Sequence, residues 1–142
     1  MQNSQIQFIE LEKIKYPLIN QFYKQFYKKG SASKDEAVFI LKRQTILCSV
    51  KLKTLEQALL LTGVATATNE RGKGYASLLI SKLIQQCSTP IYCFPYLHLE
   101  NFYQQLGFKQ LAIEQAPESI SKQFKLYNTK QTLLLMSYTS KR

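Results

Sequence analysis

The chain has 142 residues, of which 45% are hydrophobic and 20% charged, a balance that excludes a disordered chain and predicts one globular domain over residues 1–142. No apolar run approaches the roughly 20 residues of a membrane span, and the N-terminal residues have neither region of a signal peptide, so we expect a cytoplasmic protein. The net charge of +10, from 19 Lys and Arg against 9 Asp and Glu, favours partners that carry negative charge.

The first half of the chain reads as strands around one amphipathic helix. Its expected strands are Gln5–Leu11, Ala37–Leu41, Thr45–Leu52 and Ala58–Thr66. The helix begins near Pro17 and ends at Gly30, and its apolar stripe is Ile19, Phe22, Tyr23, Phe26 and Tyr27. The three leucines of Ala58–Thr66 indicate a strand that is buried on both faces.

The second half alternates helices with strands. Its expected helices are Tyr75–Gln86, Leu97–Leu106 with Gly107 as the stop, and Pro117–Lys125. Its expected strands are Ile91–Phe94, Phe108–Ile113 and Gln131–Tyr138. This alternation predicts an α/β or α+β protein with a mixed central sheet.

The three cysteines do not form a metal-ligand pattern. Cys48, Cys87 and Cys93 are accompanied by one histidine, His98, and small buried thiols in a reducing compartment are the favoured interpretation. A nucleophilic Cys93–His98 pair is conceivable, but no third group is evident that would orient it. No metal is implied.

The loop Asn69–Gly74 between a predicted strand and a predicted helix indicates anion binding. A helix N-terminus exposes unpaired N–H groups and partial positive charge. Gly72 and Gly74 let an anion approach the backbone, while Arg71 and Lys73 add positive charge at the rim. The loop is neither a Walker motif nor a dinucleotide fingerprint, yet it suits a phosphate or a pyrophosphate.

Two segments resemble the signatures of the GNAT superfamily of acyl-CoA-dependent N-acyltransferases. Leu59–Thr66 followed by Asn69–Ala76 is similar to its acetyl-CoA-binding motif, and Asn101–Phe108 is similar to its Phe-Tyr-x-x-x-Gly-Phe signature. The order of elements matches over nearly the whole chain. The resemblance implies a mixed, mostly antiparallel central sheet of six to seven strands, flanked by about four helices and splayed between strands four and five.

The resemblance also assigns roles to individual residues. It implies that the backbone of Val64, Ala65 and Thr66 pairs with the pantetheine and the thioester carbonyl of acetyl-CoA. The resemblance implies that backbone amides bind the pyrophosphate in the segment that comprises Glu70, Arg71, Gly72, Lys73, Gly74, Tyr75 and Ala76. Tyr103 takes the place of the tyrosine that protonates the leaving thiolate, a task that suits a hydroxyl donor.

The sequence departs from the family pattern in places. Asn69 replaces a Gln or Arg, Tyr96 stands at a position that is often Asn, and no general base stands out. Glu56, Glu100, His98 or a water wire could deprotonate the amine. In this architecture the first helix helps to shape the acceptor groove, although its aromatic residues are better explained as core.

The predicted function is the transfer of an acetyl group from acetyl-CoA to a primary amine of a small molecule or a peptide, by direct attack in a ternary complex. A catalytically silent acyl-CoA-binding regulator of the same fold is one alternative. A basic nucleic-acid-binding module is another, supported by the charge and by 9 Tyr and 8 Phe but opposed by the dispersed basic residues. The net charge disfavours polycationic acceptors, and a homodimer is left open.

Overall fold

The computed structural model describes residues 5–27 and 31–140. The chain divides into two compact units, each built from two stretches of sequence. We call Met1–Leu52 with Gly63–Gln85 the N-terminal unit, and Lys53–Thr62 with Gln86–Arg142 the C-terminal unit. Across the described residues, no helix has the length and apolar character that crossing a membrane requires.

Within the described residues, seven strands are hydrogen-bonded into one sheet in the order β1-β2-β3-β4-β5-β7-β6. Their bounds are β1 Gln7–Glu10, β2 Glu36–Lys42, β3 Ile46–Leu55, β4 Ala58–Thr66, β5 Ile91–Cys93, β6 Lys109–Gln110 and β7 Met136–Tyr138. β4 and β5 are parallel, whereas β1–β2, β5–β7 and β6–β7 are antiparallel. The turns that join β2 to β3 and β3 to β4 are too short for a parallel crossover, so these pairs are antiparallel as well. The expected mixed, mostly antiparallel sheet is confirmed.

β4 is longer than the segment that pairs with β5. The register matches Leu59, Leu60 and Leu61 of β4 with Ile91, Tyr92 and Cys93 of β5. β5 ends at Cys93, but β4 continues to Thr66. The end of β4 therefore extends past its paired residues, at the place where the family resemblance implies a splay between the fourth and fifth strands.

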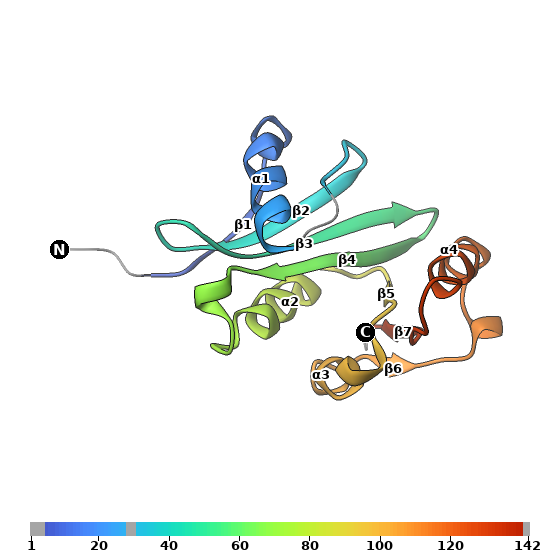
Figure 1. Ribbon diagram of the computed structural model, residues 1–142. Coiled ribbons are helices and arrows are strands. Elements are labelled where there is room, and N and C mark those ends of the chain that lie inside the picture. The colour runs from blue at the N-terminus through green and yellow to red at the C-terminus, as the bar shows by residue number, and fades with distance from the viewer. Residues whose placement is uncertain (1–4, 28–30, 141–142) are drawn as a thin grey trace. The chain divides into compact units, whose positions relative to one another are not determined.

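The core of the N-terminal unit lies under helix α1, Tyr16–Phe26. The buried residues of this helix repeat at helical spacing, and they pack against Val38, Ile40 and Ala65 of the sheet. Helix α2, Tyr75–Gln85, buries Leu79, Ile80 and Leu83 and lies on the opposite face of the sheet from α1 (Figure 1). Both faces of this part of the sheet are thus covered, which explains the continuous burial of β3 from Leu47 to Leu52.

The core of the C-terminal unit lies beside helix α4, Glu118–Asn128. Ile120 of this helix is fully buried and packs with Leu60, Tyr92 and Leu135. Helix α3, Glu100–Gln105, follows a 3₁₀ turn over Leu97–Leu99. Gly107 ends it with a φ of 101°, and a Cβ there would meet the Tyr138 ring at 2.9 Å, so a glycine is required for both reasons.

Two expected strands are shorter than the sequence indicates. The strand expected over Phe108–Ile113 is reduced to β6, since the Gln115 side chain accepts the Ala112 N–H at 2.8 Å and a 3₁₀ turn follows. The strand expected over Gln131–Tyr138 is reduced to β7, since Asn128 accepts the Leu133 N–H at 2.8 Å. In both cases a side-chain amide takes a backbone donor that a longer ladder would use. The expected helix stop at Gly30 lies outside the described residues.

Candidate functional site

The predicted phosphate loop follows the end of β4. A 3₁₀ turn over Thr68–Glu70 is followed by the exposed residues 71–74, and then by α2. The Leu78 N–H donates to the Gly74 carbonyl at 3.0 Å, so the hydrogen bonding of α2 begins at Gly74. The N–H groups of the first turn of α2 have no partner within the helix. They lie at the positive end of the helix dipole.

The two glycines of this loop have left-handed backbones that face open space. Gly72 has a φ of 79° and Gly74 a φ of 83°. A Cβ built at either position would meet no atom within 4 Å. The glycines are therefore needed for their backbone conformation, and the space next to them is available to a ligand. This geometry fits a pyrophosphate held by backbone N–H groups.

The charged side chains of the loop are engaged with the protein itself. The Arg71 guanidinium donates to the carbonyl of Thr66 at 3.3 Å and to that of Phe26 at 3.4 Å, which ties the loop to β4 and α1. Lys73 forms an ion pair with Glu70 at 3.0 Å. Because that pair is exposed and weak, a phosphate can compete for the Lys73 ammonium. Backbone donors are the principal anion ligands that this loop offers.

The end of β4 holds the three residues that are expected to contact the pantetheine and the thioester. Ala65 is buried in the core beneath α1, while Val64 and Thr66 are half-buried. The Thr66 hydroxyl lies 3.4 Å from the Cys48 sulfur. The residues expected to pair with pantetheine are thus adjacent in one strand, and they lead directly into the loop.

Tyr103 belongs to the C-terminal unit. It lies in α3, is 6% exposed, and packs edge-on against Phe102 and Phe108 with centroid distances of 5.0 and 5.5 Å. These contacts hold the ring of the predicted acid in a fixed orientation.

The three candidate bases have different surroundings. Glu56 lies in the turn between β3 and β4, with a φ of 56°, beside a depression of about 510 Å³ that Tyr92, Pro90 and Pro117 also line. Glu100 accepts a hydrogen bond from Gln104 at 3.4 Å. His98 is exposed and stacks on Tyr96 at 5.8 Å. None has a contact that marks it as the base.

The Cys93 thiol is poorly suited to nucleophilic catalysis. It is 2% exposed, and burial raises the pKa of this thiol, which keeps it protonated at neutral pH. The Cys93–His98 pair considered from the sequence therefore gains no support. Among residues 5–27 and 31–140, no cluster of three His, Cys, Asp or Glu side chains could hold a metal ion.

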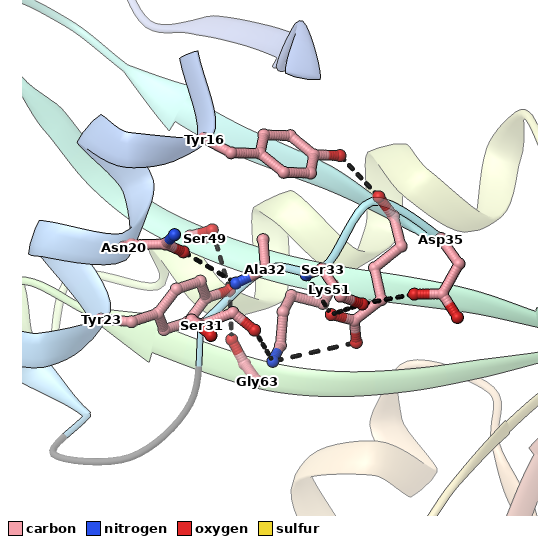
Figure 2. Close-up of polar contacts among 11 residues, drawn as sticks. Tyr16, Asn20, Tyr23, Ser31, Ala32, Ser33, Asp35, Ser49, Lys51 and Gly63 are labelled. Carbon is pink, nitrogen blue, oxygen red and sulfur yellow. Dashed lines mark hydrogen bonds and ion pairs between the residues drawn. The ribbon is translucent and has the colours of Figure 1, made fainter. Parts of the chain in front are cut away.

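One polar cluster was missed by the sequence reasoning (Figure 2). Tyr23 of α1, expected as a core aromatic, is fully buried but also donates a hydrogen bond to the Gly63 carbonyl at 2.7 Å. A glycine within a strand, as at Gly63, often marks a bulge or a close approach. That signal could have pointed to this site.

Comparisons with known proteins agree with the geometry. The model of the Acetyltransferase (GNAT) family matches residues 7–108, which include the loop and Tyr103. The comparison with the sequences of curated proteins gives no match.

Several solved structures share the fold. N-acetylglutamate synthase from Neisseria gonorrhoeae, complexed with coenzyme A and L-arginine, has a TM-score of 0.74 at 12% identity, with 99% of this chain and 34% of that one covered. An acyl-CoA N-acyltransferase from Pseudomonas aeruginosa has a TM-score of 0.68 at 16% identity, with 95% and 100% covered. A GNAT acetyltransferase from Brucella melitensis, in complex with acetyl-CoA, has a TM-score of 0.62 at 12% identity, with 75% and 84% covered. The present chain spans about a third of the length of the Neisseria synthase.

Proposed function

The chain belongs to the acetyltransferase (GNAT) family, and from that premise we propose that it is an acyl-CoA N-acyltransferase that transfers an acetyl group from acetyl-CoA to a primary amine. The observation that carries the proposal is the loop before α2, where Gly72 and Gly74 leave open space beside a helix N-terminus. The complexes of similar folds with coenzyme A and acetyl-CoA support the choice of donor.

In this proposal the loop binds the pyrophosphate of the donor. The N–H groups of residues 72–76 donate to its oxygens, Glu70 and Arg71 hold the loop in shape, and Lys73 adds positive charge. Val64, Ala65 and Thr66 offer backbone groups to the pantetheine. Acetyl-CoA supplies the acetyl group as an activated thioester.

The proposed reaction is a direct transfer. The amine nitrogen attacks the thioester carbonyl carbon, so that a C–N bond forms and the C–S bond breaks. Backbone N–H groups at the end of β4 stabilise the charge that develops on the carbonyl oxygen. The Tyr103 hydroxyl gives its proton to the departing sulfur, while the amine loses a proton to water or to one of Glu56, Glu100 and His98. Binding both substrates together lets the protein orient the attack.

The net charge of +10 bears on the acceptor. Like-charge repulsion slows the approach of polycations, so neutral or acidic molecules that carry one primary amine are the favoured class. A screen should therefore begin with amino acids and peptide N-termini, with polyamines included for contrast.

Replacement of Tyr103 by Phe tests the proposed acid. We expect Tyr103→Phe to lower kcat by about 10²-fold or more, the scale of a lost general acid, with the KM for acetyl-CoA unchanged. Release of CoA during the amine screen is the measurement. Tyr138→Phe is the matched control because the Tyr138 ring also packs on Phe108, at 5.7 Å.

Two results would contradict parts of this account. Normal turnover by Tyr103→Phe would remove Tyr103 from the reaction. Tight binding of acetyl-CoA without transfer to any amine would instead favour the catalytically silent regulator.

A further inference from the structure

The Gly63 carbonyl is held by a buried chain of hydroxyl groups (Figure 2). The Tyr23 hydroxyl donates to it at 2.7 Å and lies 3.0 Å from the Ser49 Oγ. A tyrosine has a single hydroxyl proton, and this one goes to Gly63, so Ser49 must donate to the Tyr23 oxygen. Tyr23 and Ser49 are 0% exposed, which shields both bonds from competition by water.

The backbone at Gly63 is shaped for this contact. Its φ of 64° interrupts the extended conformation of β4, and its carbonyl is bound by a helix side chain. A Cβ at this position would lie 2.6 Å from the Lys51 Cε and 3.4 Å from the Tyr23 Oη. A side chain at this position would be strained at that φ and would displace the Lys51 side chain, so glycine suits the close approach of α1 and β3 to β4.

The hydrogen bond from Tyr23 to the Gly63 carbonyl also fixes the orientation of the Val64 N–H. The Gly63 C=O and the Val64 N–H belong to one planar trans peptide, so they point in opposite directions. A hydroxyl that holds the carbonyl toward α1 therefore directs the Val64 N–H away from α1. Val64 is the first of the β4 residues expected to meet the acyl group.

We propose that Tyr23 is a positioning residue, whose hydroxyl orients the Gly63–Val64 peptide so that the Val64 N–H donates to the carbonyl oxygen of the bound acyl group. The inference rests on the proposed function, because it names the donor that this function needs. Chemically, a donor fixed in advance stabilises the growing negative charge without reorganisation during the reaction.

The surroundings of Tyr23 keep its hydroxyl in place. The Lys51 ammonium lies 5.4 Å from the Tyr23 ring centroid, donates to the Ser31 carbonyl at 3.1 Å and pairs with Glu36 at 3.8 Å. These contacts restrict the ring from the side of β2 and β3. Burial raises the pKa of Tyr23, so the hydroxyl keeps its proton, and remains a donor, across the neutral range.

The test compares two Tyr→Phe variants on the same helix. Tyr23→Phe removes the hydroxyl that binds Gly63, whereas Tyr16→Phe removes one that donates to the Glu36 carbonyl at 2.5 Å. The probe is acetyl-CoA labelled with ¹³C at its thioester carbonyl, whose stretching band is followed by difference infrared spectroscopy. Affinity for CoA, which lacks the acetyl group, is measured alongside.

We expect the bound carbonyl band of the wild type and of Tyr16→Phe to lie below its position in buffer, and Tyr23→Phe to lose most of that shift. CoA affinity should be the same in all three proteins. With an amine that the enzyme acetylates, kcat should fall about tenfold in Tyr23→Phe at an unchanged KM for acetyl-CoA, as for a modest misplacement of a catalytic donor. A band that is identical in Tyr23→Phe and the wild type would overturn the inference.

A second measurement needs only the wild type, in case Tyr23→Phe does not fold. In ¹H–¹⁵N spectra, exchange of CoA for acetyl-CoA should move the Val64 amide proton downfield more than that of Ala65 or Thr66. A change confined to other amides would overturn the inference. Failure of acetyl-CoA to bind at all is a separate result, which would overturn the proposed function itself and this inference with it.

Discussion

Gly63, Gly72 and Gly74 share a left-handed backbone, but their surroundings separate their roles. Gly63 is enclosed by Lys51 and Tyr23, whereas no atom lies within 4 Å of a Cβ built at Gly72 or Gly74. The first glycine therefore serves packing within the N-terminal unit, while the other two leave room beside the start of α2. This contrast supports the proposal that the loop at Gly72 and Gly74, and not the strand at Gly63, makes room for a ligand.

A substitution at Gly72 tests that distinction. Gly72→Ala adds only the strain of a left-handed alanine, about 1–2 kcal/mol, and should fold with weakened CoA binding. Gly72→Glu also places a carboxylate beside the expected pyrophosphate, so we expect CoA binding to be lost. Calorimetric titration with CoA is the measurement. Gln85→Glu, at the exposed far end of α2, is the control for the change in charge, and equal CoA affinity in Gly72→Glu and Gln85→Glu would refute a phosphate site here.

At the scale of elements, the turn between β3 and β4 carries local strain. Glu56 is exposed and adopts a φ of 56°, a conformation that costs an L-residue roughly 1–2 kcal/mol. Glu56→Gly should relieve that strain and leave the free energy of unfolding unchanged or higher, since the flexibility of glycine in the unfolded chain offsets part of the gain. Urea denaturation measures this free energy of unfolding. Glu56→Val should lower stability, and the reverse order of the two variants would show that the turn is not strained.

The elements also show what a sequence can and cannot predict. β4 runs over Ala58–Thr66 as predicted, because an apolar run bounded by turn residues has few alternatives. β6 and β7 are shorter than predicted, because the Gln115 and Asn128 amides capture backbone donors. Periodicity carries no information about such side-chain competition.

The site divides in the same way. The glycines of the loop, the strand before it and the helix after it are neighbours in the sequence. The sequence alone therefore predicts this loop. The bond between Tyr23 and Gly63 joins residues that are 40 positions apart. Only the packing of α1 on the sheet brings them together, and helical spacing alone identifies Tyr23 as nothing more than a core residue.

For the whole molecule, the net charge of +10 is compatible with two kinds of polyanion. An acyl-CoA donor would be bound at the loop, through backbone donors and shape. A nucleic acid would be bound by basic residues over a wider surface, with steep salt dependence. Family membership and the open loop favour the donor, and the two ligands can be separated in a single experiment.

That experiment is thermal unfolding of the protein with acetyl-CoA, CoA, ATP or an oligonucleotide, at matched ionic strength. A ligand at 100 times its dissociation constant stabilises the native state by about 2.7 kcal/mol, which raises the Tm of a domain of this size by several degrees. We expect this rise with acetyl-CoA and with CoA, and none with ATP. No rise with acetyl-CoA or CoA, together with stabilisation by the oligonucleotide, would contradict the proposed acyl transfer and identify the loop before α2 as a structural turn.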